Sequence, residues 1–422
     1  MENIKEIIPI KKLDAQINSP PSKAHTIRSL FFAALGEGRT TIINPLLGKD
    51  QRVAIQALKD LGASIALKEN KIYVDGANGK FKPAKENIYI ENSGITARIL
   101  AVVGALSDKE IIMDGNDRMR KGRPLQDLLD AARPLGIKAE SIKGNGCPPI
   151  RIENSEFTGG ETKLKGSKSS QYFSALLMAA PFAENDCIIK TEGELMSKPY
   201  VDITIDMMKD FGCEVRNENY KEFVVKAKQK YKSREYRIEG DYSAASFFFA
   251  AAAITRGKIR INNLYQKSAQ GDKRFVDFLE MMGCSVSRGA DWVELEGKPL
   301  KGIRVDMGDY PDIVIPLAVV SAFAEGKTEI FNISHLKYKE SDRIRAPVAE
   351  LKKMGINAQA YEDKMVIEGG NPGPAEIDTY KDHRMVMSFA VAGLKVPGIK
   401  IREPENCQKS FPDFFEVLEG LR

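Results

Sequence analysis

The sequence predicts an α/β protein of two domains, built from six copies of one structural unit. Two observations support this prediction. An apolar, alanine-rich stretch recurs at a spacing of about 70 residues, and each copy is followed by a short strand pattern and then by an amphipathic helix pattern. Equivalent positions of a repeated unit occupy equivalent points of the fold. Polar residues that recur at the start of the apolar stretches are therefore candidates for one shared site.

Each unit opens with an apolar helix, followed by a short strand, an amphipathic helix and two further strands. The apolar helices are expected over residues 22–35, 94–106, 169–182, 243–254, 312–323 and 382–394. The short strands are expected over residues 40–43, 110–113, 187–190, 258–261, 328–331 and 399–401. In five copies the amphipathic helix ends at an apolar residue directly before a glycine, which is the usual residue just beyond a helix end.

The last unit stops inside its second helix, at Arg422, while the chain begins with an apolar stretch (residues 4–17) that has no unit before it. We expect this N-terminal stretch to supply the strands that the C-terminal half lacks. One domain would then comprise residues 1–18 and 238–422, and the other residues 19–237. Two crossings near residues 18 and 238 would act as a hinge.

The composition is typical of a soluble globular protein, with 43% hydrophobic and 29% charged residues. The net charge of +5 is too small to indicate nucleic-acid binding. Apolar runs stay well below the roughly 20 residues of a membrane span, and the N-terminus does not resemble a secretory signal. Five scattered cysteines suit a reducing cytoplasm, and three distant histidines show no metal-ligand spacing. We expect a cytoplasmic protein without a metal or cofactor.

The starts of the apolar helices carry basic residues where the helix dipole disfavours them. Lys23, Arg28, Arg98 and Arg384 lie in or near first turns. Serine, asparagine and aspartate at such starts are ordinary capping residues, so each start alone indicates little. Taken together they favour anion binding, because free N–H groups and the positive dipole end attract phosphate or carboxylate.

The loops that precede the amphipathic helices are also charged. They include residues 118–123, 197–200 and 339–343. Charge runs in loops are usually solvated surface, and from the residues alone this interpretation stays open beside a functional one.

Eight short motifs give the chain a specific resemblance. They are Pro21-Ser22-Lys23, Asn92-Ser93-Gly94, Arg123-Pro124, Gly166-Ser167-Lys168-Ser169-Ser170-Gln171, Ser197-Lys198-Pro199-Tyr200, Lys339-Glu340-Ser341-Asp342-Arg343, Asp382-His383-Arg384-Met385 and Lys409-Ser410-Phe411-Pro412-Asp413. In this order, and over essentially the whole chain, they resemble the 5-enolpyruvylshikimate-3-phosphate synthase family. The resemblance implies a two-domain inside-out α/β barrel of six βαβαββ repeats, with buried parallel helices and domains that close on the substrates.

The resemblance also implies the reaction, which is transfer of the carboxyvinyl group of phosphoenolpyruvate to the 5-hydroxyl of shikimate 3-phosphate in aromatic amino acid biosynthesis. The implied catalytic residues are Lys23, Asp312 and Glu340. Those implied to bind shikimate 3-phosphate are Lys23, Arg28, Ser169, Ser170, Gln171, Ser197, Tyr200, Asp312 and Lys339. Those implied to bind phosphoenolpyruvate are Lys23, Gly94, Arg123, Gln171, Arg343, Arg384 and Lys409. Asp312 would accept the hydroxyl proton, and Glu340 would protonate the methylene carbon. The implied partners are these small molecules only, and we expect a monomer.

The chemistry agrees with these residue types. Adding an alcohol across an enol ether needs an acid for the carbon and a base for the hydroxyl, while guanidinium groups match phosphate and carboxylate oxygens. Because nearby cations favour the ionised form of a carboxyl group, Glu340 needs burial or a neighbouring carboxylate to hold its proton.

The sequence departs from the family pattern at Ala24, Ile95 and Ile99. Serine, threonine and proline are usual at these three positions, and the changes affect the expected response to the inhibitor glyphosate more than the reaction.

Three other functions fit the sequence less well. The sister enzymes that act on UDP-N-acetylglucosamine typically carry a cysteine in the loop occupied here by residues 114–123, which has none. RNA 3′-phosphate cyclases would need a catalytic histidine near the C-terminus, whereas His383 opens a buried helix. A non-catalytic scaffold would not need Lys23, Asp312, Glu340 and Lys409 together.

Overall fold

The computed structural model describes residues 3–421, and the chain forms two compact units. Unit 1 comprises Met1–Pro20 and Glu239–Arg422, and unit 2 comprises Pro21–Ile238. The chain therefore passes between the units twice, after Pro20 and after Ile238.

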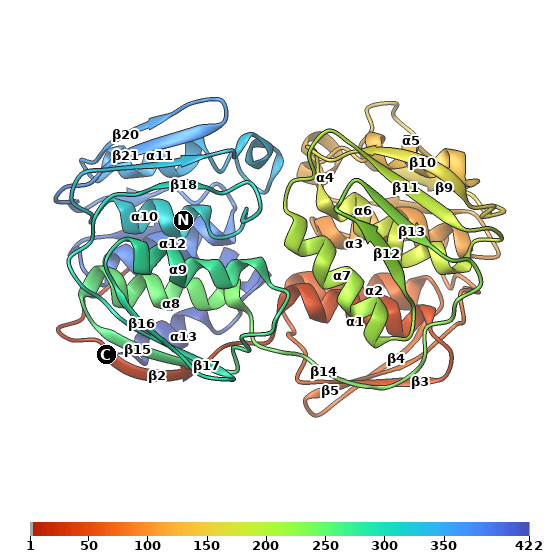
Figure 1. Cartoon of the computed structure of the whole chain (residues 1–422), viewed down its shortest axis with the longest axis horizontal. Coiled ribbons are helices and arrows are strands. Elements are labelled where there is room, and N and C mark those ends of the chain that lie inside the picture. Colours follow the sequence, from red (N-terminus) through yellow and green to blue (C-terminus); the bar gives the residue numbers. More distant parts are fainter. Residues whose placement is uncertain (1–2, 422) are drawn as a thin grey trace. The chain divides into compact units, whose positions relative to one another are not determined.

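Unit 2 contains three buried helices enclosed by amphipathic helices and three sheets (Figure 1). The buried helices are α1 (Lys23–Leu35), α3 (Gly94–Val103) and α6 (Ser170–Ala179), and the others are α2 (Lys49–Asp60), α4 (Asp117–Gly122), α5 (Gln126–Ala132) and α7 (Lys198–Asp210). The sheets have the orders β14-β3-β5-β4, β6-β7-β9-β8 and β10-β11-β13-β12. Their strands are β3 (Arg39–Ile43), β4 (Ser64–Lys68), β5 (Lys71–Asp75), β6 (Asn87–Tyr89), β7 (Ile111–Asp114), β8 (Ala139–Ser141), β9 (Ile150–Ile152), β10 (Gly160–Lys165), β11 (Cys187–Glu192), β12 (Val215–Glu218), β13 (Glu222–Val225) and β14 (Glu235–Arg237).

Unit 1 repeats this plan. Its buried helices are α8 (Tyr242–Thr255), α10 (Val314–Ser321) and α12 (His383–Gly393), with α9 (Phe275–Met281), α11 (Arg345–Lys353) and α13 (Phe414–Glu419) outside them. Two sheets have the orders β16-β17-β15-β2 and β18-β19-β21-β20, and the third has the order β1-β23-β22. The strands are β1 (Ile4–Glu6), β2 (Asp14–Asn18), β15 (Lys258–Asn262), β16 (Ser285–Arg288), β17 (Trp292–Glu296), β18 (Arg304–Asp306), β19 (Lys327–Phe331), β20 (Asn357–Ala360), β21 (Lys364–Glu368), β22 (Glu376–Ile377) and β23 (Lys400–Arg402).

The N-terminal segment supplies strands to two sheets of unit 1. Strand β1 pairs antiparallel with β23, with Ile4 opposite Arg402, and β2 pairs parallel with β15. Within residues 3–421, α13 is the last element, and the sheet of the last repeat has three strands where the other five sheets have four.

The sequence of the central helices explains their burial. Helix α8 is apolar on every side, and Phe247, Phe248 and Phe249 are each at most 1% exposed. A helix without a polar face has no side to present to water and must be covered all round. In unit 1, α10 contacts both α8 and α12, and in unit 2, α3 contacts α6.

Three of the expected helices are shorter than predicted. The α-helical parts of residues 94–106 and 169–182 end at Val103 and Ala179, and 3₁₀ turns, η1 (Gly104–Leu106) and η3 (Ala180–Phe182), complete both stretches. Pro181 has no N–H to continue the α-helical ladder.

The third correction is at the start of α10, which lies at Val314 rather than at Asp312. A helix that began at residue 312 would need its carbonyl to accept from the N–H of residue 316, but that residue is Pro316. The first possible bond therefore runs from Leu317 N to Ile313 O. The Asp312 carbonyl instead accepts from Arg384 Nη1, at 3.0 Å.

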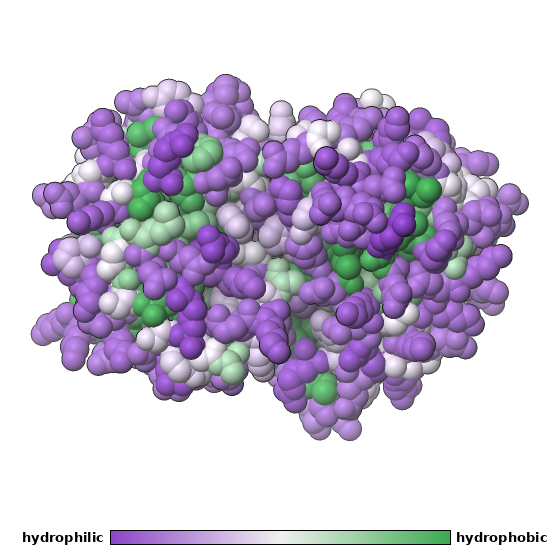
Figure 2. All heavy atoms as spheres, viewed as in Figure 1, coloured by the Kyte–Doolittle hydropathy of each residue, from purple (hydrophilic) through white to green (hydrophobic). Residues whose placement is uncertain are grey.

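The face of the molecule that Figure 2 shows is mainly polar. In Figure 2 hydrophilic residues dominate the visible face, and the exposed large apolar side chains include Tyr89, Met281 and Tyr338. Among the described residues, no helix combines the length and the apolar character that crossing a membrane requires.

Candidate active site

Polar side chains gather at the starts of the buried helices in each unit. In unit 1 they form a network of alternating charge that we call the unit 1 cluster. Its members are Asp312, Glu340, Arg343, Asp382, Arg384 and Lys409.

Local structure brings the six members together. Asp312 precedes α10, and Glu340 and Arg343 lie in the loop between the 3₁₀ turn η5 (Ser334–Tyr338) and α11. Asp382 is the capping residue of α12, where its side chain accepts from the Arg384 N–H, and Arg384 lies in the first turn. Lys409 ends the 3₁₀ turn η6 (Pro404–Lys409).

Arg343 is the centre of the cluster. Its side chain is 1% exposed and contacts three carboxylates: Nη1 lies 2.8 Å from Asp312, Nη2 3.0 Å from Glu340, and Nε 2.8 Å from Asp382. Burial alone lowers the pKa of Arg343, but Asp382, Glu340 and Asp312 outweigh it and raise this pKa above its ordinary value. The guanidinium group is therefore permanently charged and sets the positions of the three acids around it.

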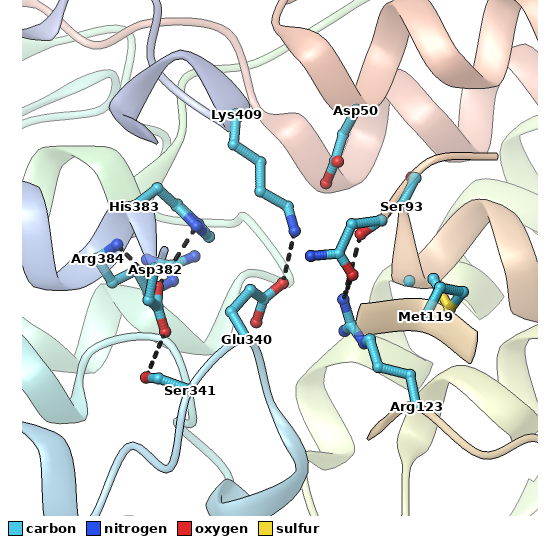
Figure 3. A network of polar contacts seen from close by, with 12 residues as sticks. Asp50, Ser93, Met119, Arg123, Glu340, Ser341, Asp382, His383, Arg384 and Lys409 are labelled. Atoms are coloured by element: carbon cyan, nitrogen blue, oxygen red, sulfur yellow. Dashed lines mark hydrogen bonds and ion pairs between the residues drawn. The ribbon is translucent and has the colours of Figure 1, made fainter. Parts of the chain in front are cut away.

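The remaining two cations complete the pairing. Arg384 Nη2 lies 2.8 Å from Asp312, and Lys409 Nζ lies 3.1 Å from Glu340 Oε1 (Figure 3). Three carboxylates thus face three cations. Removing one partner of such a buried network typically costs about 3–5 kcal/mol, because the opposite charge is left uncompensated.

A strained turn delivers Asp382 and Arg384 to the cluster. Tyr380 and Lys381 have φ of 51° and 55°, in the left-handed region that costs non-glycine residues energy. Glu350 of α11, which is fully buried, anchors this turn: it accepts from the Tyr380 hydroxyl at 2.7 Å and from the Asp378 N–H at 3.0 Å. The segment that leads into α12 is therefore held at two points, by Glu350 of α11 and by Arg343 of the loop before α11, which contacts Asp382.

Two buried titratable residues of unit 1 were not singled out from the sequence. Asp272 is 4% exposed and accepts from the Ser243 hydroxyl. Burial, and then the charge of Asp312, raise the pKa of Asp272 to about 7, although Arg384 acts in the opposite direction. The second residue is His335, whose pKa is lowered to about 3 by burial and by Lys339, so that it is neutral at physiological pH. Sequence spacing carried no signal for either residue, because both depend on burial.

In unit 2, Lys23 and Asp50 form an ion pair at the start of α1. Ser22 caps this helix, and Lys23 Nζ lies 2.7 Å from Asp50 Oδ2 in the first turn of α2. Asp50 is 5% exposed, so the lysine at this helix start has a buried counter-charge within the same unit.

Arg28, one turn further along α1, is in the opposite situation. It is fully buried, and the four groups that accept its hydrogen bonds are all neutral. Burial lowers the pKa of Arg28 to about 10, which leaves it charged at neutral pH.

Arg123 covers the start of α3. Its Nη1 donates to the carbonyl and the side-chain oxygen of Asn92, at 3.2 and 3.3 Å, and Figure 3 shows the side chain pointing toward the loop of Ser93. A Cβ atom on Gly94 would lie 2.5 Å from Arg123 Nη2, so only glycine leaves this guanidinium in place. Of the departures noted above, Ile95 is 8% exposed and Ile99 fully buried. The hydroxyl missing at residue 95 is present one position later, where Thr96 Oγ1 lies 2.8 Å from Ser93 Oγ.

Three serines lie at the starts of α6 and α7, two helices that pack together. Ser169 caps α6 by accepting from the Gln171 N–H at 3.3 Å, and Ser170 is the first helical residue. Ser197 precedes α7 with φ of 58°, and its hydroxyl does not cap the helix. Hydroxyls and helix-start N–H groups are suitable ligands for a phosphate.

The predicted site residues thus fall into two sets. Unit 1 contains Asp312, Lys339, Glu340, Arg343, Arg384 and Lys409, and unit 2 contains Lys23, Arg28, Gly94, Arg123, Ser169, Ser170, Gln171, Ser197 and Tyr200. Within unit 1, all but Lys339, which directly precedes Glu340, belong to the cluster. Among residues 3–421, no group of three or more His, Cys, Asp or Glu side chains is arranged to hold a metal ion.

The chain is similar to known proteins over nearly its whole length. The pattern of the EPSP synthase (3-phosphoshikimate 1-carboxyvinyltransferase) family matches residues 7–418. A protein of Trichormus variabilis named 3-phosphoshikimate 1-carboxyvinyltransferase is 41% identical over 408 residues, 96% of each chain. One of the same name from Mannheimia haemolytica is 41% identical over 426 residues, 98% of each chain. A solved structure of EPSP synthase from Acinetobacter baumannii superposes with a TM-score of 0.85 at 27% identity, covering 100% of this chain and 98% of that one. The α/β fold class predicted from the repeats is confirmed.

The raised pKa of Asp272 predicts a pH-dependent effect on stability. A carboxyl group whose pKa is near 7 in the folded protein and about 4 in the unfolded chain favours folding at low pH, and this contribution is lost as the pH rises through 7. Asp272→Asn has no carboxyl group at this position and does not suffer this loss. The melting temperature of the variant minus that of wild type, measured by thermal denaturation, should therefore increase from pH 4 to pH 8. Asp291→Asn, at an exposed aspartate, is the control. If the difference in melting temperature between Asp272→Asn and wild type does not change with pH, the raised pKa of Asp272 is contradicted.

Proposed function

This chain belongs to the EPSP synthase family, and from that premise we propose how its residues divide the work of the reaction. The enzyme transfers the enolpyruvyl group of phosphoenolpyruvate to the 5-hydroxyl of shikimate 3-phosphate and releases phosphate, in the shikimate pathway of aromatic amino acid biosynthesis. The assignment of residues rests chiefly on one observation: Asp312 and Glu340 contact the same buried guanidinium group, that of Arg343.

We assign the acid–base chemistry to these two carboxylates. In the addition step, the oxygen of the 5-hydroxyl bonds to the central carbon of phosphoenolpyruvate, and Asp312 takes the hydroxyl proton. Glu340 gives a proton to the methylene carbon of phosphoenolpyruvate. In the elimination step, Glu340 takes a proton back from the resulting methyl group and the C–O bond to phosphate breaks, which restores the vinyl group. The departing phosphate takes the proton that Asp312 received, so both carboxyl groups return to their starting state. One guanidinium group holds both carboxylates, and this keeps an acid and a base a few ångströms apart.

Two cations of the unit 1 cluster contact Glu340 in the absence of substrate. Its two carboxylate oxygens are engaged by Arg343 and Lys409, which favour the ionised form. Phosphoenolpyruvate carries a phosphate and a carboxylate, and these compete for the same cations. We infer that binding of this substrate draws Lys409 away from Glu340, so that the acid can hold a proton when it is needed while Arg343 keeps it in position.

The remaining residues are assigned to substrate binding. Ser169, Ser170 and Ser197 would bind the phosphate of shikimate 3-phosphate, supported by the free N–H groups of two helix starts. The other groups assigned to this substrate are Lys23, Arg28, Gln171, Tyr200, Asp312 and Lys339. Those assigned to phosphoenolpyruvate are Lys23, Gly94, Arg123, Gln171, Arg343, Arg384 and Lys409.

We also propose that the enzyme is a cytoplasmic monomer. All five cysteines are buried and unpaired, which supports a reducing compartment. Light scattering during size-exclusion chromatography tests the monomeric state directly.

The acid–base assignment predicts severe losses of turnover. Asp312→Asn and Glu340→Gln keep the size of the side chain but remove proton transfer, so each should lower kcat by at least about 100-fold. Phosphate release under saturating substrates measures kcat, and circular dichroism verifies folding. Glu325→Gln, at an exposed glutamate, should behave as wild type. A variant of Asp312 or Glu340 with turnover within a few-fold of wild type would remove that residue from its role.

The phosphate assignment predicts a selective loss of affinity. Replacing Ser169 and Ser170 together by alanine should raise the KM for shikimate 3-phosphate at least about 10-fold more than that for phosphoenolpyruvate, because hydrogen bonds to a charged ligand are lost. Ser233→Ala, at an exposed serine of the same unit, is the control. Equal increases for both substrates would indicate that another anion occupies this position.

The close approach at Gly94 predicts the opposite selectivity. The methyl group of Gly94→Ala would displace the guanidinium group of Arg123, and the KM for phosphoenolpyruvate should rise by roughly 10-fold. Since a long side chain can move aside, the melting temperature should change little. Gly370→Ala, whose added Cβ meets only Ile356 at 3.8 Å, is the matched control. An unchanged KM for phosphoenolpyruvate would separate Arg123 from that substrate.

A further inference from the structure

Arg28 is a fully buried cation for which unit 2 supplies no negative partner among its described residues. Its Nε donates to Thr204 Oγ1 at 2.8 Å and its Nη1 to the Ala24 carbonyl at 3.2 Å. Its Nη2 donates to the Tyr200 carbonyl at 3.1 Å and to Ser174 Oγ at 3.4 Å. These bonds use four of the five N–H groups of a guanidinium. The fifth, on Nη1, and the net charge are left for a ligand.

Thr204 joins three elements at this point. It lies in α7, one turn beyond Tyr200, and is fully buried. Its hydroxyl is 2.8 Å from Arg28 Nε of α1, 2.8 Å from Ser174 Oγ of α6, and 3.0 Å from the carbonyl of Tyr200. Ser174 is also fully buried, so water cannot replace any of these contacts.

The protons of this group can be assigned from the acceptors alone. The Tyr200 carbonyl can only accept, so Thr204 must donate its single proton there. Thr204 Oγ1 then accepts from Arg28 and from Ser174, and Ser174 Oγ accepts from Arg28 Nη2. In each bond among Arg28, Ser174, Thr204 and the Tyr200 carbonyl, the donor is thus the group nearer to Arg28 in this series. Because no donor and acceptor can exchange roles, the guanidinium plane is held in a single orientation.

We propose that Thr204, assisted by Ser174, is a positioning residue that orients Arg28 to receive an acidic group of shikimate 3-phosphate. This inference rests on the proposed function, in which Arg28 and Tyr200 bind that substrate. Thr204 does not touch the substrate in this role. It fixes Arg28 and the backbone of Tyr200 relative to one another, and both belong to the same binding set.

Thr204→Val is the decisive variant, because valine matches the shape of threonine and lacks only the hydroxyl. The buried Arg28 Nε would lose its acceptor, and the KM and Kd for shikimate 3-phosphate should rise by at least about 10-fold. The KM for phosphoenolpyruvate and the kcat should stay within about two-fold. Thr204→Ser restores the hydroxyl and should recover most of the affinity. Kinetics and calorimetric titration with shikimate 3-phosphate measure both quantities.

Thr162→Val is the matched control for stability. Thr162 is 3% exposed in the same unit, and its hydroxyl donates to the Ala131 carbonyl at 2.6 Å, away from the binding set. This variant should lose thermal stability without losing affinity for shikimate 3-phosphate. If Thr204→Val does not fold, Ser174→Ala takes its place and should raise the same KM by a smaller factor.

Arg28→Lys separates the failure of this inference from the failure of the proposed function. If Arg28→Lys leaves the affinity for shikimate 3-phosphate unchanged, the assignment of Arg28 to this substrate is wrong. If Arg28→Lys weakens that affinity while Thr204→Val or Ser174→Ala behaves like Thr162→Val, the positioning role is overturned. Equal increases in the KM values of both substrates in Thr204→Val would likewise overturn it.

Discussion

The contact of Arg343 with three carboxylates determines much of unit 1. A guanidinium group that is 1% exposed has to be neutralised within the protein, and Asp312, Glu340 and Asp382 each approach it along a different N–H direction. Those acids come from three segments: the residues before α10, the loop before α11 and the cap of α12. One side chain therefore links three segments that belong to two successive repeats. The left-handed turn at Tyr380 and Lys381 serves the same neutralisation, because it brings Asp382 into contact with Arg343.

The two buried arginines illustrate two different uses of one residue type. Arg343 is surrounded by acids, so its charge is balanced before any ligand arrives. Arg28 donates its hydrogen bonds to neutral oxygens only, so its charge is not balanced by them. The first arrangement is stable in itself and, in the proposed function, places acids for proton transfer. The second is costly without a ligand, and in the proposed function this cost gives selectivity for a negatively charged substrate.

The repeats made the fold predictable, whereas the contacts within the site were only partly so. Apolar helices such as α8 are recognisable because a helix without a polar face must be buried, and the left-handed glycines after the amphipathic helices mark their ends. The start of α10 was predicted two residues early, since periodicity does not register that Pro316 lacks an N–H. Motifs indicated Glu340 and Arg343, but not that Arg343 would be bonded to Glu340. Asp272 and Thr204 carry no motif at all, because their significance arises from burial and from neighbours distant in the chain.

The pairing of Ile4 with Arg402 has a consequence for the order of assembly. Unit 2 is a continuous stretch, Pro21–Ile238, and all its strands and helices leave the ribosome before unit 1 is half made. The segment that precedes unit 2, by contrast, must wait for β15 and β23 before its own strands find partners. Contacts of such long sequence separation form late because loop closure must come first. During synthesis β1 and β2 thus stay unpaired after unit 2 is complete, and the nascent chain is most exposed to mispairing over this interval.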